Sequence, residues 1–272
     1  MITGVKSSST TPTLSKGSVL LVATLAAFVT PFMGSSINIA LPLIGQEFDM
    51  DAITLGWIST SYLLALSIFL VPFGRIADIY GRKRIFTWGI IVYTISSLLT
   101  GLATSTNLLI VFRILQGISG AMCFGTVVAI LTSVFLPGER GRALGINVAS
   151  VYSGLSLGPV LGGLIVEHLG WRSIFFINAA MGLVIIAITL AKLRGEWSEA
   201  KGEKFDYVGS IVYGVALAAL MLGFSSLRGR CQFVVGNGWH CVADSLHLDG
   251  VTNEKSGAQC EHVPAQYRFH AF

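Results

Sequence analysis

Seven long stretches without a charged residue are the feature that most restricts the fold of this chain. They cover residues 17–46, 52–74, 85–112, 114–138, 143–166, 173–191 and 207–227. A helix needs roughly 20 apolar residues to cross a bilayer, and each stretch is close to or above that length. Charged residues make up only 12% of the chain, whereas a soluble domain carries about twice that share. The sequence therefore predicts an all-α, polytopic membrane protein.

The turn residues between these stretches narrow the predicted spans. The spans are approximately 19–42, 54–74, 85–103, 107–136, 143–165, 173–192 and 207–227. They divide the chain into a cytoplasmic N-terminal segment, a six-helix bundle, a cytoplasmic linker, a seventh transmembrane helix and an irregular polar tail. In the same order, these parts cover 1–18, 19–192, 193–206, 207–227 and 228–272.

The connections that are rich in Lys and Arg alternate with connections that are not. The basic connections are the N-terminal segment, 75–84, 140–142 and 192–204, and the others are acidic or nearly neutral, with Arg172 as the exception. Cytoplasmic loops of membrane proteins carry an excess of Lys and Arg. We therefore expect the N-terminus to lie in the cytoplasm.

A short pattern occurs twice in the chain. It reads G-x-I-x-D-x-x-G-x-K at 74–83 and G-x-I-x-E-x-x-G-x-R at 163–172, an offset of 89 residues (163 − 74). The first copy follows the second predicted span on the inside, and the second copy follows the fifth span on the outside. Spans one to three and four to six are therefore predicted to be inverted copies of each other. The two turns would then be the halves of a symmetric gate.

The first copy belongs to the strongly basic turn 74–84, which contains a single acid, Asp78. A carboxylate at a helix end can hold Arg82 or Arg75, or bind the N-terminus of a neighbouring helix. A plain positive-inside loop would explain the basic residues, but neither Asp78 nor the glycines. The turn resembles the signature between spans two and three of the major facilitator superfamily. That resemblance implies a gating role for Gly74, Arg75, Asp78, Gly81, Arg82 and Lys83.

Arg113 is the only ionisable residue well inside a predicted span. An unpaired charge there costs from about 2.5 kcal/mol upward, so it should face a polar cavity or a partner, unless it snorkels to the outer surface. Its surroundings, from Leu109 to Ala121, are similar to the span-four motif of the superfamily, which implies a role in proton coupling or in a substrate-linked charge. The candidate cavity residues are Asn38, Arg113, Gln116 and Gly117.

The fifth predicted span carries glycines at spacings that share one helix face, together with an internal proline. Such glycines let a second helix approach closely, and proline removes a backbone hydrogen bond. Generic small-residue packing would also account for them. The stretch resembles the span-five signature of the superfamily's antiporter branch, which in that family marks exporters. Its residues are Gly154, Gly158, Pro159, Gly162 and Gly163.

Three further stretches resemble the fourteen-span drug:proton antiporters of the superfamily, namely 37–42, 171–178 and 205–209. That family usually has an Asp in span one, but Met33 stands at the corresponding position here. No carboxylate then lies deep in the first six spans. Coupling to a proton or another ion would depend on Asp206 or on sequence not present.

The tail contains three of the four cysteines and most of the histidines. Zinc sites favour short ligand spacings such as C-x-x-C, and no such pair occurs, so we predict no metal site and no cofactor. We interpret 228–272 as disordered or aberrant. Basic charge sits in short loops, so no nucleic-acid partner is expected, and no catalytic constellation in the spans indicates an enzyme.

Together these features predict a plasma-membrane transporter of the major facilitator type. Its partners would be the lipid bilayer, a small and drug-like substrate and a coupling ion, and the full-length protein would export drugs along an ion gradient. The chain supplies one six-helix half, so we expect a fragment that does not transport alone. The alternative is a non-transporting membrane module that binds or regulates a partner, or a seven-helix receptor. A receptor has no evident need of the inverted repeat.

Overall fold

The computed structural model describes residues 16–193, 200, 202–203, 205–221 and 223, and in this part of the chain every regular element is a helix. The all-α prediction is confirmed. The numbered helices are α1 (Lys16–Glu47), α2 (Ala52–Tyr80), α3 (Arg82–Gly101), α4 (Thr106–Val134), α5 (Pro137–Leu169) and α6 (Arg172–Lys192). A shorter helix, Tyr207–Met221, follows them. The predicted tail and N-terminal segment lie almost wholly outside the described residues.

Five of these helices, α1, α2, α4, α5 and α6, are long and apolar enough to cross a membrane. This confirms a multi-pass membrane protein. Helix α3 has 20 residues, which is enough for one crossing, but it begins with Arg82, Lys83 and Arg84 and carries hydroxyl side chains. It is therefore not among the five by composition. In the described residues, the helix Tyr207–Met221 is also shorter than a span requires.

The basic turn is much tighter than the loop 75–84 predicted from the sequence. Helix α2 continues to Tyr80 and α3 begins at Arg82, so only Gly81 separates them. Gly81 has a φ of 114°, a conformation that glycine adopts without the steric cost that other residues incur. The backbone N–H of Gly81 donates to the carbonyl of Ala77. One glycine therefore ends α2 and starts α3.

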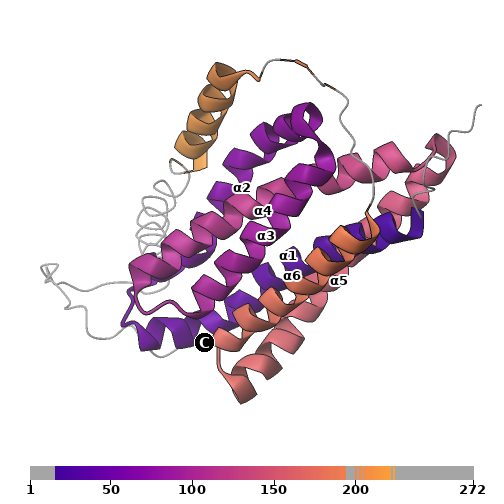
Figure 1. The fold of residues 1–272 in the computed structure, drawn as a ribbon. Coiled ribbons are helices and arrows are strands. Elements are labelled where there is room, and N and C mark those ends of the chain that lie inside the picture. The colour runs from indigo at the N-terminus through magenta and orange to yellow at the C-terminus, as the bar shows by residue number, and fades with distance from the viewer. Residues whose placement is uncertain (1–15, 194–199, 201, 204, 222, 224–272) are drawn as a thin grey trace, which may run out of the picture. The chain divides into compact units, whose positions relative to one another are not determined.

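Helix packing follows the predicted inverted repeat. Helix α1 packs mainly on α5, α4 packs on α2 and almost as extensively on α3, and α3 also packs on α6. Figure 1 shows α4 beside α2 and α3, and α1 beside α5 and α6. Exchanging α1–α3 with α4–α6 turns the α1–α5 pair into the α4–α2 pair and leaves the α3–α6 pair unchanged. This exchange is expected of two inverted three-helix copies.

The α1–α5 pair is held together through three glycines of α5. Gly154, Gly158 and Gly162 are buried, and a Cβ at any of them would meet atoms of α1. At Gly158 the hydroxyl of Ser36 donates to the carbonyl oxygen over 2.9 Å. The other two residues of the predicted span-five motif do not share this contact. Pro159 is exposed, and a Cβ at Gly163 would reach only one atom, at 4.0 Å.

The α2–α4 pair uses the same device with the glycines on α4. A Cβ at Gly117 would collide with the carbonyl oxygen of Tyr62. A Cβ at Gly125 would lie 3.4 Å from the backbone nitrogen of Gly74 and 3.2 Å from the carbonyl oxygen of Leu70. Helices in lipid associate through such close contacts, because lipid is as apolar as their side chains. Both main helix pairs therefore depend on glycine, which has no side chain to keep the backbones apart.

These contacts predict different outcomes for two identical substitutions in α5. Gly154→Ala places a Cβ 2.5 Å from the carbonyl oxygen of Phe28, a backbone atom that cannot swing away, and such overpacking costs about 1–3 kcal/mol. We expect a lower midpoint of thermal unfolding for the purified protein in detergent. Gly163→Ala is the matched control and should leave the midpoint unchanged. Equal midpoints for the two variants would contradict the packing role of Gly154.

Candidate functional site

A largely apolar cavity lies between helices α1, α2, α4 and α5. Its volume is about 470 Å³, which is within the range of small-molecule sites. The two glycine-packed pairs form its walls, since α1 and α5 line one side and α2 and α4 the other. The cavity therefore lies between the two helix pairs, each of which combines one helix from each copy of the repeat.

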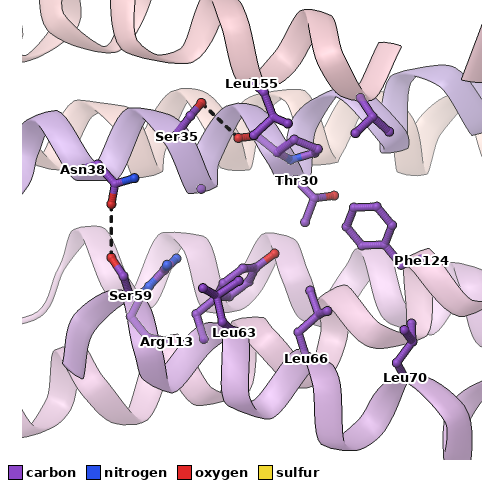
Figure 2. A pocket seen from close by; sticks show the side chains of 14 residues that line it. Thr30, Ser35, Asn38, Ser59, Leu63, Leu66, Leu70, Arg113, Phe124 and Leu155 are labelled. Carbon is purple, nitrogen blue, oxygen red and sulfur yellow. Dashed lines mark hydrogen bonds between the residues drawn. The ribbon is translucent and has the colours of Figure 1, made fainter. Parts of the chain in front are cut away.

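The charged group of the cavity and two of its polar side chains lie toward one end. Figure 2 shows Asn38, Ser59 and Arg113 together there, while Leu70 and Phe124 lie at the opposite end. The hydroxyl of Ser59 donates to the Oδ1 atom of Asn38 over 3.3 Å. The cavity is therefore amphipathic along its length.

Arg113 is the charged group of this site, and only 1% of its surface is exposed. Its Nε atom donates to the carbonyl oxygen of Ile58 over 3.1 Å, and its Nη1 atom donates to Oε1 of Gln116 over 2.6 Å. The guanidinium carbon lies 4.4 Å from the centre of the Tyr62 ring, within the range of a cation–π interaction. A carbonyl, an amide and an aromatic face stabilise the charge, and all three are neutral.

A chain of buried polar side chains continues behind Arg113. The Nε2 atom of Gln116 donates to the hydroxyl of Ser97 over 2.7 Å. On the far side, Nδ2 of Asn178 donates to Ser97 over 3.4 Å and to the hydroxyl of Tyr93 over 2.9 Å. The chain connects α4 to α3 and α6, so it fixes the orientation of Gln116 and, through it, of Arg113.

The four predicted cavity residues divide into two groups. Asn38 and Arg113 line the cavity. Gln116 is fully buried behind Arg113, and Gly117 packs on the backbone of α2, so neither is in the wall. Met33, the residue at the position of the family's span-one acid, is also buried, and it belongs to an apolar cluster and not to the cavity lining.

The sequence reasoning missed Tyr62, Ser59 and Ser97 as members of the site. Their only signal was the presence of a polar group inside an apolar window, and α3 and α4 carry many other hydroxyls that donate only to their own helix, such as Thr94 and Thr126. Sequence alone does not separate these two uses of a hydroxyl.

At the basic turn, Asp78 pairs with Arg82. The Oδ1 atom of Asp78 accepts from Nε and Nη2 of Arg82 at 2.8 and 2.7 Å. Arg82 also donates from Nη1 to the carbonyl of Ala129 over 3.1 Å and to Ser133. The pair therefore joins the α2–α3 turn to the end of α4. Arg75 instead pairs with Glu203, and both of these side chains are about half exposed.

The second copy of the pattern forms a similar joint with different residues. Gly170 has a φ of 79° and ends α5, as Gly81 ends α2. The next residue, Trp171, donates from Nε1 to Glu47 at the end of α1 over 2.6 Å, and Arg172 pairs with Glu47 at 2.7 Å. Glu167, the counterpart of Asp78, is exposed. The repeated backbone turn is confirmed, but the ion pair within it is not repeated.

The comparison with protein families agrees with this architecture. The model of the Major Facilitator Superfamily matches residues 23–242. The chain belongs to the major facilitator superfamily. The match includes all of the cavity residues and extends into the segment that the sequence set apart as an irregular tail.

Several curated members of the superfamily are similar to the chain. The riboflavin transporter RibZ of Clostridioides difficile is 30% identical over 80% of this chain and 48% of its own length. The multidrug resistance protein Stp of Mycobacterium tuberculosis is 35% identical over 74% of this chain and 38% of its own. The cephamycin export protein CmcT of Amycolatopsis lactamdurans is 35% identical over 90% of this chain and 49% of its own length. The chain thus spans about half the length of the curated relatives it matches, or less.

The buried polar chain predicts the effect of a substitution at Gln116. Gln116→Leu removes the acceptor for Arg113 and the donor for Ser97, and a hydrogen bond to a charged group contributes about 1.5–3 kcal/mol. We expect a clearly lower midpoint of thermal unfolding in detergent. Ser119→Ala is the control, because this buried hydroxyl donates only to its own helix. A Gln116→Leu midpoint equal to that of Ser119→Ala would contradict the positioning role.

Proposed function

We propose that this chain forms one half of a secondary transporter that exports small, largely apolar molecules. The observation that carries the proposal is the cavity between the two helix pairs, with one buried cation at its polar end. In superfamily transporters the substrate site lies near the bilayer midplane, between six-helix halves. The names of the relatives support efflux, since several of them are export or multidrug resistance proteins.

In this proposal the cavity is one wall of the substrate site. Helices α1, α2, α4 and α5 line it, and they would face a second six-helix half. The second half would supply the opposite wall. An apolar wall with few polar groups suits substrates that are recognised by shape and burial more than by many hydrogen bonds.

The proposed membrane is the plasma membrane, with the N-terminus in the cytoplasm. The positive-inside pattern supports this orientation, because the basic turn around Arg82 and the residues Arg140 and Arg142 would all lie on the cytoplasmic side. Export then requires the cavity to open alternately to the two sides of the membrane.

The Asp78–Arg82 pair is a candidate for the cytoplasmic gate. It joins the α2–α3 turn to the end of α4, and the neighbouring linker binds the same turn, because the backbone N–H of Ala200 donates to the carbonyl of Asp78 over 3.1 Å. An ion pair at such a junction can form in one conformation and break in another.

The coupling ion, a proton or another cation, would be handled outside the cavity wall described above. The acids of the described residues lie at helix ends and connections, and none lines the cavity. Asp206 has a structural role, since it accepts from the backbone N–H of Gly209 over 2.9 Å and caps the helix Tyr207–Met221. A carboxylate of the second half is therefore the proposed coupling group.

An efflux assay tests the proposed function. We expect an efflux-deficient bacterial host to accumulate less of a fluorescent dye when it makes the chain together with the second half of a matched relative. An uncoupler should abolish the difference, and the 272-residue chain alone should have no effect. Uncoupler-sensitive export by the chain alone would contradict the need for a second wall.

The gate predicts a specific effect of Asp78→Asn in the same transporter. Loss of the carboxylate charge weakens the bond to Arg82, and we expect the export rate to fall several-fold while membrane insertion stays normal, as judged by the amount of protein in the membrane fraction. Arg140→Gln is the control, because Arg140 is exposed, lies outside the predicted gating set and donates to the carbonyl of Phe135. Undiminished export by Asp78→Asn would count against the gate.

A further inference from the structure

The charge of Arg113 is not balanced by any acidic group of the described residues. Its hydrogen-bond partners are Ile58 and Gln116, and the ring next to it belongs to Tyr62. A charge buried in a membrane protein pairs with an opposite charge or with backbone carbonyls, because isolated burial is costly, and in the described residues Arg113 has neutral partners only. Because Arg113 lines the cavity, a bound anion would supply the opposite charge.

The hydrogen bonds of the guanidinium determine which of its atoms is left for a ligand. Nε and Nη1 of Arg113 already donate within the protein. Nη2 has no hydrogen bond in the described part of the chain. It is therefore not a fully buried atom, because the fully buried side-chain atoms without a hydrogen bond belong to Asn147, Asn178 and Thr189 in this part of the chain. Arg113 lines the cavity although only 1% of its surface is exposed, so Nη2 is the nitrogen left to bind a molecule there.

Asn38 adds a second donor at the same level of the cavity. Arg113 binds the carbonyl of Ile58, and Asn38 accepts from the next residue of α2, Ser59. Because the Oδ1 atom of Asn38 is occupied in this way, its amide N–H groups face the site without an acceptor among the described residues. The polar end therefore presents donors, and one of them is charged.

The rest of the cavity is suited to an apolar body. Leu66, Leu70, Phe124 and Leu155 line the part away from Arg113 (Figure 2). A volume of about 470 Å³ leaves room for a fused aromatic system as well as an acidic head group. An ammonium head group would be repelled by Arg113, and a neutral head group would leave its charge uncompensated.

We propose that this cavity selects organic monoanions, with the acidic group bound by Arg113 and Asn38 and an aromatic or aliphatic body in the apolar end. The inference rests on the proposed transport function and names its substrate class. Charge-assisted hydrogen bonds to guanidinium are about twice as strong as neutral ones, and the low dielectric of the cavity strengthens them further.

Three probes of similar size, which share the naphthalene ring and differ in the charge of the head group, test this selectivity: naphthylacetate, naphthylethanol and naphthylethylamine. Their binding to the purified 272-residue chain in neutral detergent is measured by isothermal titration calorimetry at neutral pH. We expect the anion to bind about 10- to 100-fold more tightly than the alcohol, the range that one hydrogen bond to a charged group provides. The amine should bind most weakly. Equal binding of all three probes would overturn the proposal.

The Asn38→Asp variant tests the proposal without replacing Arg113, whose own contacts with Ile58, Gln116 and Tyr62 are left in place. A carboxylate at position 38 would compensate Arg113, so the preference for the anion should disappear. Asn107→Asp is the matched control, because Asn107 is exposed in the first turn of α4 and outside the cavity, where a negative charge is favourable. This variant should retain the wild-type preference. An unchanged preference in Asn38→Asp would overturn the proposal.

The second six-helix half provides a further check. If an acidic side chain of that half pairs with Arg113, naphthylacetate should bind the isolated chain but not the assembled transporter, and that result would also overturn the proposal. The titration measures binding without an ion gradient. A failure of anion selectivity therefore leaves efflux intact, whereas a failure of efflux leaves anion binding measurable.

Discussion

The close backbone contact between paired helices is the constraint on which the rest of this structure depends. In lipid there is little hydrophobic drive to bring apolar helices together, so association relies on packing and on hydrogen bonds between helices. Here Gly154, Gly158 and Gly162 allow α5 to approach α1, and Gly117 and Gly125 allow α4 to approach α2. Each pair becomes one wall, and the cavity is the space that remains between the two walls. The position of the site therefore follows from the positions of these glycines in α4 and α5.

The buried arginine is tolerated because the structure surrounds it with oriented neutral groups. Ile58 supplies a carbonyl oxygen, Gln116 an amide oxygen and Tyr62 the face of an aromatic ring. Ser97 in turn fixes the amide of Gln116. These contacts lower the cost of burial but do not cancel the charge. A cation held in this way remains available to a negatively charged group, which links the packing of three helices to the chemistry of the cavity.

The two copies of the repeat share a backbone device and differ in their side chains. Gly81 and Gly170 both adopt positive φ values and end a helix abruptly. The following residues, Arg82 and Trp171, then bind the end of the first helix of the other copy. One joint uses an arginine and the other a tryptophan with a neighbouring arginine. The symmetry of the fold therefore resides in its turns and helix pairs, and the charges on the two faces can differ.

Much of this arrangement was predictable from the sequence by itself. Long uncharged windows require helices in a bilayer, the 89-residue offset (163 − 74) of the pattern indicated inverted copies, and the cost of burying Arg113 indicated a cavity or a partner. These inferences depend only on local composition and spacing. The end of α2 could not be predicted in this way. The charged residues after Gly74 are typical of a loop, but in the structure they continue α2, and Gly81 alone forms the turn. Likewise, only the tertiary structure decided that Asn38 and Arg113 share a cavity while Gln116 and Met33 do not, because the side that each residue faces depends on which helix packs against it.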